Sequence, residues 1–303
     1  MIDRKHALLS VSLAALLFQL IQVLVVVQAC NPVTGDFSDC SGSVFNAISV
    51  NGITDNNAPS LRNTEFFNSQ FVSCTLGSLD FSLARYNVLR WNSNQSPNGN
   101  WMDQQASRLL MERSTMDNSD FSQSVWNECA IQDSSLVSTV FSNVEITASS
   151  FISVNFRNAK FTGTALNQVV FQNCDQDGFT LESSQIVSSV FRSVFTDRAA
   201  WNVPGSTFLN TQIISSTIGS GFLDDTVFYN VSIANSVFDI SDFLRTNFTL
   251  VSVTNSRIDS SRFVDAFIVQ SVFDSSEIVG GNFRRLYSPN FDFVMRNCTM
   301  DGT

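Results

Sequence analysis

Histidine is almost absent from this chain of 303 residues, because His6 is the only one. Beyond that residue the chain cannot hold a Ser-His-Asp triad, a Cys-His dyad or a histidine-ligated metal ion. Basic residues are also scarce: 17 Lys and Arg stand against 27 Asp and Glu, and the formal net charge is −10. An acidic body without a basic stripe argues against binding to a nucleic-acid backbone, which needs Lys and Arg to replace counterions.

Sequence motifs for nucleotide or metal chemistry are absent as well. The sequence has no G-x-G-x-x-G, no P-loop and no C-x-x-C. Glycoside hydrolysis by two carboxylates needs no histidine, but the only adjacent acidic pair is Asp224-Asp225, which we interpret as a solvated corner. We therefore predict a protein that is not an enzyme and that binds no cofactor and no metal ion.

The one long apolar run stands at the N-terminus. Arg4, Lys5 and His6 precede an uncharged stretch from Ala7 to Ala29. Residues 1–29 are predicted to be a signal peptide cleaved before Cys30, or a membrane anchor that is retained. A lipid on Cys30 is a third alternative, because Val27-Gln28-Ala29-Cys30 resembles a bacterial lipobox. All three predict a protein that is extracellular or lies in the cell envelope.

Phenylalanine is abundant, and it recurs with a period of five. Two runs, from Leu61 to Trp201 and from Phe208 to Cys298, give 48 positions at this period. Large apolar residues fill 42 of them, including 19 of the 28 Phe, so the pattern is not chance. A register change at 202–207, around Pro204-Gly205, separates the runs. The predicted core includes Phe121, Phe141, Phe151, Phe161, Phe171, Phe191, Phe228, Phe243, Phe248 and Phe263.

A second ladder of small residues lies two positions before the large ones. From Ser206 to Gly281, sixteen successive positions of this ladder hold only Ser, Thr, Gly, Val or Ala. A period of five fits neither the 3.6 of a helix nor the 2 of a continuous strand. It fits short extended segments that turn a corner every five residues, with the large and the small side chain both pointing inward.

The repeat resembles that of the pentapeptide-repeat family, whose consensus is a small residue, Asp or Asn, Leu or Phe, and two polar residues. Ser119-Asp120-Phe121-Ser122-Gln123 and Ser241-Asp242-Phe243 match it well, although Phe dominates over Leu here. The resemblance covers residues 61–298 and implies a right-handed quadrilateral parallel β-helix with four repeats per coil. We therefore predict an all-β solenoid of about 12 coils, ~58 Å long at ~4.8 Å per coil.

These observations divide the chain into four parts. Residues 1–29 are the signal or anchor segment, 30–60 an N-terminal cap region, 61–298 the solenoid and 299–303 a C-terminal tail. Ser96, Gln176 and Thr196 interrupt the pattern on one of the four sides, and we interpret them as corner loops or bulges. The open ends of a solenoid need covering, so a homodimer through the C-terminal coil is a further hypothesis.

Cysteines and glycosylation sequons complete the candidate sites. Cys74, Cys129 and Cys174 fall on the inward ladder more than two coils apart, so we predict buried thiols rather than disulfides. Cys30 and Cys40 are a candidate disulfide, which an exported protein permits. The candidate glycosylation sites are Asn94, Asn230, Asn247 and Asn297.

The leading functional hypothesis is a structural or interaction scaffold outside the cell. Its partner would be an unknown protein or an extracellular or envelope component, with no nucleic acid bound and the membrane contacted only through the N-terminal segment. The family resemblance also implies an alternative, a DNA-mimic inhibitor of a topoisomerase or other nucleic-acid enzyme. A carbohydrate-active β-helix enzyme is the remaining alternative.

Overall fold

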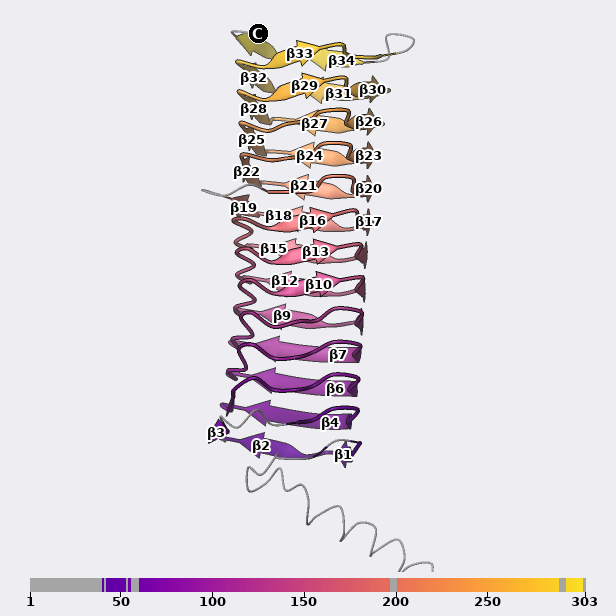
Figure 1. Cartoon of the computed structure of the whole chain (residues 1–303). Helices are drawn as coiled ribbons and strands as arrows, with labels where there is room; N and C mark the ends of the chain where they lie inside the picture. The colour runs from indigo at the N-terminus through magenta and orange to yellow at the C-terminus, as the bar shows by residue number, and fades with distance from the viewer. Residues whose placement is uncertain are drawn as a thin grey trace, which may run out of the picture.

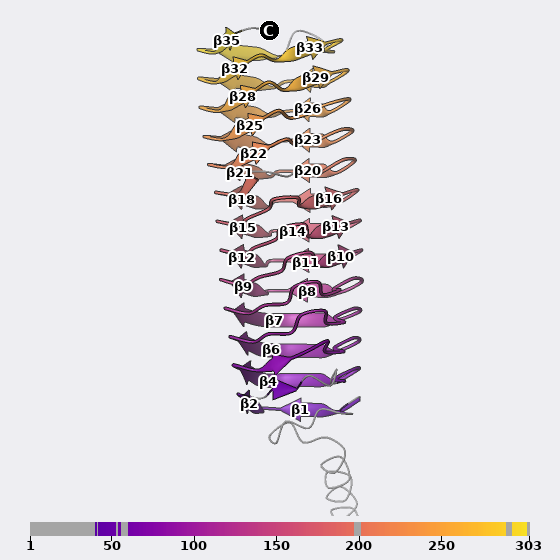
Figure 2. The same cartoon turned by 60° about the vertical axis from the view of Figure 1, so that its left-hand side comes forward.

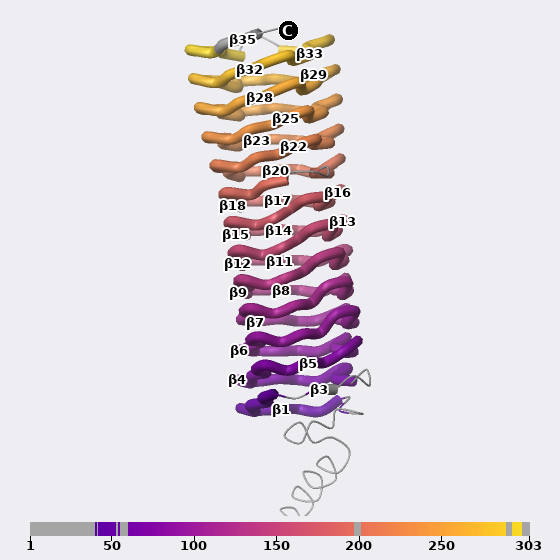
Figure 3. Tube along the Cα trace, turned by 90° about the vertical axis from the view of Figure 1, so that its left-hand side faces the viewer, coloured from indigo at the N-terminus to yellow at the C-terminus, as the bar shows by residue number. Residues whose placement is uncertain are grey.

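The computed structural model describes residues 40, 42–52, 54–55, 60–196, 201–288 and 293–301. Over these residues the chain is all-β, and its short parallel strands stack into one rod with the first and last coils at opposite ends (Figure 1). The Cα trace winds upward coil by coil without a change of direction (Figure 3). The predicted parallel β-solenoid of about 12 turns is confirmed.

Each repeat places its five residues in the same way. In the repeat around Phe141, Thr139 and Phe141 are buried, and Val140 and Ser142 lie on the outer surface. Asn143 then takes a left-handed backbone conformation, with φ of 56°, and turns the chain onto the next face. Asn, Asp, Ser and Gly tolerate this conformation best, which explains why they are common at the corners.

Four repeats complete one coil, so equivalent residues stack on one another: Phe141 pairs with Phe161, twenty residues later. We number the four faces of the rod in chain order after the central residues of their repeats. Face 1 contains Phe121, Phe141 and Phe161; face 2 contains Trp126, Ile146 and Leu166; face 3 contains Ile131, Phe151 and Phe171; face 4 contains Leu136, Phe156 and Gln176.

The strands follow these faces. Face 1 has β10 (Val140–Ser142), β13 (Lys160–Thr162), β16 (Thr180–Glu182), β29 (Arg262–Val264) and β33 (Asn282–Arg284). Face 2 has β1 (Val44–Asn46), β8 (Val125–Asn127), β11 (Glu145–Thr147), β14 (Ala165–Asn167), β17 (Gln185–Val187), β20 (Thr207–Leu209), β23 (Val227–Tyr229), β26 (Asn247–Thr249) and β30 (Phe267–Val269). Three longer strands continue from face 2 onto face 3: β4 (Glu65–Val72), β6 (Arg85–Asn92) and β7 (Gln105–Glu112).

The remaining strands belong to faces 3 and 4. Face 3 has β2 (Ser49–Asn51), β9 (Ala130–Gln132), β12 (Ser150–Ile152), β15 (Val170–Gln172), β18 (Val190–Arg192), β21 (Gln212–Ile214), β24 (Ser232–Ala234), β27 (Ser252–Thr254), β31 (Val272–Asp274) and β34 (Val294–Arg296). Face 4 has β3 (Thr54–Asp55), β5 (Thr75–Leu76), β19 (Phe195–Thr196), β22 (Thr217–Gly219), β25 (Val237–Asp239), β28 (Arg257–Asp259), β32 (Glu277–Val279) and β35 (Thr299–Asp301).

Stacked aromatic rings fill the tube. The ten phenylalanines named above as the predicted core are buried, and none is more than 2% exposed. The ring centroids of Phe141 and Phe161 lie 4.2 Å apart, and those of Phe171 and Phe191 lie 4.9 Å apart. Burying one such side chain contributes about 1.5–3 kcal/mol, so apolar burial is the main stabilising term of the rod.

The small inward ladder is polar, and its hydroxyls hydrogen-bond along the rod. The backbone N–H of Asn94 donates to Ser114 Oγ over 3.1 Å, and the N–H of Ser114 donates to Ser134 Oγ over 3.1 Å. Ser114 Oγ in turn donates to the carbonyl of Trp91 over 3.2 Å. Serine is therefore favoured at this position because it fits the space and satisfies its own buried hydroxyl.

The register change lies earlier than predicted. Phe195 still stacks on Asp175, twenty residues apart, whereas Thr180 pairs with Asn202, a separation of 22 residues. The two additional residues therefore lie between Thr196 and Trp201, not at 202–207. Trp201 consequently occupies the inward position reserved for small residues, and Val203 takes the central one.

Both ends of the solenoid differ from the predicted boundaries. Within the predicted cap region 30–60, β1 and β2 pair with β4, and Phe45 opposes Phe66, so the described part of this region is one more coil. At the other end Met295 opposes Phe273 and Met300 opposes Ile278, 22 residues apart. The predicted tail at 299–303 therefore contains a paired strand, β35.

The three interruptions are not corner loops, which corrects the prediction. Ser96, Gln176 and Thr196 all occupy central inward positions and are at most 2% exposed. Gln176 is accommodated because its Oε1 accepts a hydrogen bond of 3.0 Å from Nε1 of Trp201. The coil therefore continues through Ser96 and Gln176 in regular register, and the register change begins only after Thr196.

Candidate functional site

The four faces of the rod differ in their outer side chains. Faces 1 and 4 carry ion pairs, such as Arg262 with Asp242 on face 1 and Arg257 with Glu277 on face 4, 2.5 Å apart. Face 2 instead carries six of the twelve large hydrophobic side chains that are exposed in the described part of the chain. They are Val44, Phe67, Val125, Tyr229, Phe267 and Tyr287. They form two groups, one in the N-terminal coils and one toward the other end of the rod, which makes face 2 the candidate interaction surface.

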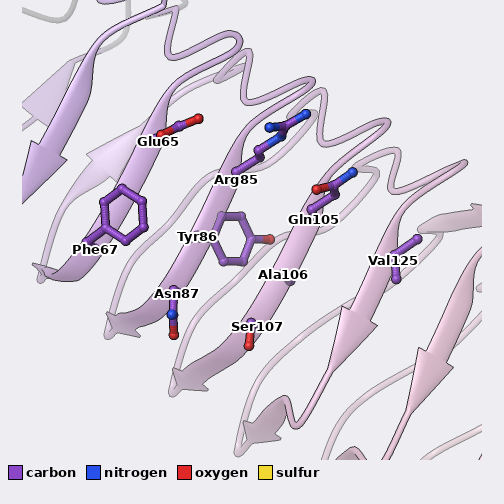
Figure 4. Close-up of a pocket in the computed structure, with 9 residues that line it drawn as sticks. All are labelled: Glu65, Phe67, Arg85, Tyr86, Asn87, Gln105, Ala106, Ser107 and Val125. Atoms are coloured by element: carbon purple, nitrogen blue, oxygen red, sulfur yellow. The ribbon is translucent and has the colours of Figure 1, made fainter.

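A depression of about 440 Å³ lies in the N-terminal part of face 2, and we call it the face 2 trench. Figure 4 shows its two rows of side chains, one at the starts of β4, β6, β7 and β8 and the other further along the first three of these strands. The first row is Glu65, Arg85, Gln105 and Val125, and the second is Phe67, Asn87 and Ser107. Since neighbouring strands lie ~4.8 Å apart, the trench runs along the rod axis over about 15 Å.

The floor of the trench lies above an unusual part of the core. Ala106 occupies a position that other coils fill with a large residue, between Tyr86 and Trp126 in the stack. The Tyr86 hydroxyl donates to Gln104 Oε1 inside the tube, and Gln104 Nε2 donates to the carbonyl of Phe81 over 3.4 Å. Burial, followed by the charge on Cys129, raises the pKa of Tyr86 well above its usual value. Tyr86 is therefore a neutral structural group.

The chemistry of the trench is that of binding. Glu65 and Arg85 are neighbours across β4 and β6, and Arg85 makes no ion pair with any residue of the described ranges. Gln105 and Asn87 add amides that donate and accept hydrogen bonds, while Phe67 adds an aromatic ring that is 38% exposed. These groups can recognise a partner by shape, hydrogen bonds and one free guanidinium.

A second, smaller depression of about 340 Å³ adjoins the trench at the corner between faces 2 and 3. It contains Arg90, which follows Arg85 by one repeat on β6, together with Ile48, Gln70 and Val88. The long strands β4 and β6 thus contribute to both depressions. The N-terminal coils therefore present a wide, uneven surface at faces 2 and 3, while a further depression of about 310 Å³ lies on face 4 around Val237, Arg257 and Glu277.

The acidic pair Asp224-Asp225 is only partly the solvated corner that was predicted. Asp225 is exposed and forms a bidentate ion pair with Arg245, 2.6 Å away, which lowers the pKa of Asp225. Burial, followed by the charge of Asp242, raises the pKa of Asp224. Asp224 lies on face 1, away from the face 2 trench.

Buried cysteines offer no reactive thiol. Cys74, Cys129 and Cys174 are buried thiols on the inward ladder, as predicted. Burial raises the pKa of Cys129 and of Cys174 to about 11 in each case. Their thiolates are therefore scarce at neutral pH, and these residues act as small packing groups.

The glycosylation sequons are sorted by the structure. Asn94 is fully buried, because its side chain bonds the N–H of Cys74 and the carbonyl of Phe71, so the candidate site at Asn94 is wrong. Asn230 and Asn297 are exposed at corners, and Asn247 is half-buried on face 2. These three remain candidate acceptors.

Several predictions on the N-terminal segment fall outside the described residues. The signal or anchor segment 1–29 and the lipid on Cys30 are among them. Cys40 is disulfide-bonded, and Cys30, its expected partner, also lies outside the described residues. Among residues 40–301 as described, no helix has the length and apolar character to span a membrane.

The face 2 trench was not predicted from the sequence. Its one detectable signal was Ala106, which breaks the pattern of large residues. Gln104, two residues earlier, stacks between the small residues Ala84 and Ser124, but Leu89 and Leu109 also stand on this ladder, so Gln104 gave no clear signal. Depressions on the outer surface depend on how the outer side chains lie relative to each other, which the periodicity of the inward residues does not report.

Five-residue repeats, four to a coil, make this chain a β-solenoid of the pentapeptide-repeat type. No family model and no curated protein matches the sequence. Solved structures similar to it include HetL from the cyanobacterium Nostoc, a pentapeptide repeat protein involved in heterocyst differentiation regulation. HetL is 9% identical with a TM-score of 0.44, and 82% of this chain and 87% of that chain are covered.

Two further solved structures are also similar to this chain. QnrB1, a plasmid-mediated fluoroquinolone resistance protein, is 14% identical, with 82% of this chain and 94% of that chain covered and a TM-score of 0.23. PfbA, a surface adhesin of Streptococcus pneumoniae, is 10% identical, with 81% and 86% covered and a TM-score of 0.27. These likenesses concern the fold alone.

Proposed function

We propose that this protein is a non-enzymatic scaffold, exported or tethered to the membrane by residues 1–29, that presents face 2 to a partner outside the cell. The observation that carries the proposal is the gathering of exposed apolar side chains and a depression on one face of a rigid rod. A partner protein or an envelope component would contact Phe67, Arg85 and Asn87 in the face 2 trench. The rod itself supplies rigidity, since each coil packs on its neighbours throughout.

Three basic residues at 4–6 precede the apolar run at 7–29, and this arrangement supports the location of the protein outside the cytoplasm. Self-association through the C-terminal coil belongs to the same proposal. Phe283, Phe293 and Met295 are only half-buried and pack against the core from one side. Static light scattering over a range of concentrations tests this part; a monomer throughout would refute it.

The alternatives have less support. A DNA mimic would have to meet a nucleic-acid enzyme inside the cell, whereas the proposed export by residues 1–29 takes this acidic rod to the outside. A glycoside hydrolase needs two carboxyl groups facing one substrate, and the face 2 trench has only Glu65 among its lining residues. A scaffold is the function that requires no group beyond those present.

Two measurements test the proposal. Residues 1–29 fused to a reporter enzyme should export it from the cytoplasm, and retention inside the cell would refute the location. The full-length protein should then capture an envelope or secreted component after cross-linking. A trench variant, Phe67→Asp with Arg85→Glu, should lose at least tenfold in capture, whereas a matched face 3 variant, Ile214→Asp with Arg192→Glu, should not. Equal capture by both variants would refute the role of the trench.

A further inference from the structure

The outer residues of face 2 lose all charge toward the C-terminal half of the rod. Figure 2 shows the strands of this face one above another, from β8 through β14 to β26. We call its outward residues from Ala165 to Tyr287 the uncharged strip. They are Ala165, Asn167, Gln185, Val187, Thr207, Leu209, Val227, Tyr229, Asn247, Thr249, Phe267, Val269 and Tyr287. Its side chains are amides, hydroxyls, aliphatic groups and aromatic rings, and none of them is an Asp, Glu, Lys, Arg or His.

Aromatic rings lie exposed on the strip. Tyr229, Phe267 and Tyr287 are 43%, 40% and 53% exposed. The rings of Phe267 and Tyr287 are neighbours on successive coils, with centroids 4.4 Å apart and planes tilted by 35°. Tyr229 lies two coils below Phe267, about 10 Å along the rod at ~4.8 Å per coil. Phe267 and Tyr287 lie in one column of the strip and Tyr229 lies in the neighbouring column. Together the three rings offer exposed apolar contact to an elongated ligand.

Between the rings lie groups that make neutral hydrogen bonds. Thr249 Oγ1 donates to Oδ1 of Asn247 over 2.8 Å, which holds the Asn247 amide flat against the sheet. Thr207 and Gln185 repeat this polar character two and three coils below Asn247. Each of these groups can both donate and accept, which suits a ligand rich in hydroxyl groups.

The dimensions of the strip favour a narrow, elongated ligand. Its seven coils span about 29 Å at ~4.8 Å per coil, and its width is that of a single three-residue strand. The resulting plan area is on the order of 300 Å², well below the ~800 Å² per partner of a standard protein interface. The strands β17, β20, β23 and β26 each have a parallel neighbour on both sides, so no free backbone edge is available along this part of the strip for an added peptide strand.

We infer that the uncharged strip binds a single extended chain of a neutral polysaccharide along the rod axis. The apolar faces of the sugar rings pack against the exposed surfaces of Tyr229 and of the Phe267–Tyr287 pair. Sugar hydroxyls exchange hydrogen bonds with Asn247, Thr249 and Gln185. The strip runs along the rod without a break because its successive strands pair in register, so it fits a linear chain rather than a branched or globular ligand. This inference rests on the proposed function, since it names the component outside the cell that face 2 binds.

The test uses the full-length protein and insoluble cellulose, chitin and β-1,3-glucan as probes, with the acidic polysaccharide alginate as the charged comparison. Wild type should co-sediment with at least one neutral polysaccharide, with little dependence on salt. The strip variant Tyr229→Ala, Phe267→Ala, Tyr287→Ala should bind it at least tenfold more weakly. The control variant, Phe195→Ala with Phe222→Ala, removes exposed rings from faces 4 and 1 and should bind as wild type does.

Three results would overturn the inference. They are no binding of wild type to any neutral polysaccharide, undiminished binding by the strip variant, or binding to alginate alone with loss at high salt. Light scattering gives a fourth result that would overturn it. If wild type is a dimer and the strip variant is a monomer, the strip binds a second copy of the chain. Capture of an envelope component through the trench is measured separately. If that capture persists while polysaccharide binding fails, the strip inference falls and the scaffold proposal stands.

Discussion

The substitution Phe141→Ala tests how the rod is held together. Phe141 is fully buried, with its ring centroid 5.0 Å from that of Phe121 and 4.2 Å from that of Phe161. Losing the burial of a whole phenyl ring costs about 2–3 kcal/mol, and losing its ring contacts adds about 1 kcal/mol more. A loss of about 3–4 kcal/mol is therefore expected, in the range measured for Phe→Ala in protein cores.

Equilibrium unfolding in urea, followed by far-ultraviolet circular dichroism, measures this loss. The matched control is Phe222→Ala, on the same face, because Phe222 is 50% exposed and should cost less than about 1 kcal/mol. A solenoid can unfold in segments, so the unfolding curve can contain more than one transition. Both variants are therefore compared by the urea midpoint of the same transition, the one that Phe141→Ala shifts. If Phe141→Ala and Phe222→Ala destabilise equally, stacked rings are not the main stabilising element and the reasoning is refuted.

Three further predictions follow from local chemistry. Ile240 is a β-branched residue in the left-handed conformation, with φ of 49°. Ile240→Asn should relieve this strain and raise the thermal midpoint by the equivalent of about 1 kcal/mol. An unchanged midpoint would contradict the strain. Cys129 and Cys174, with pKa values of about 11, should resist a maleimide at pH 7 until the protein is unfolded, and rapid native labelling would contradict their burial. Because the folded pKa of Asp224 is raised, its ionised form opposes folding at neutral pH, and Asp224→Asn should stabilise at pH 7. This gain should vanish as the pH falls through the ordinary range of an aspartate, and a gain that does not change with pH would refute the assignment.

The inward residues made the fold predictable. Large residues every fifth position, with small ones two before them, identify both the period and the buried side, because each repeat must bury the same two side chains. The boundaries were less predictable. In the sequence, Trp201 falls on the five-residue period of the large residues. In the structure it takes the position of a small residue, because two residues are inserted before it. Periodicity cannot distinguish an insertion before Trp201 from one after it.

The outer surface was much less predictable. The polar stretches around Ser96 and Gln176 were interpreted as loops, because Asn, Asp and Ser favour turns of many kinds. In this fold every repeat ends in a left-handed residue, so such residues report a regular corner instead. The face 2 trench and the uncharged strip arise from residues twenty apart that stack as neighbours. They become visible only when the chain is wound into coils.

The central claim is that twenty residues advance the rod by one strand spacing, and spin-label distances test it most directly. Asn87, Asn167 and Tyr229 are exposed and stack in one column of face 2. With Cys298 replaced by serine, nitroxides on Asn87→Cys with Asn167→Cys should lie about 19 Å apart. Those on Asn87→Cys with Tyr229→Cys should lie about 34 Å apart, four and seven coils at ~4.8 Å each. Distances that do not scale with the number of coils would contradict the account.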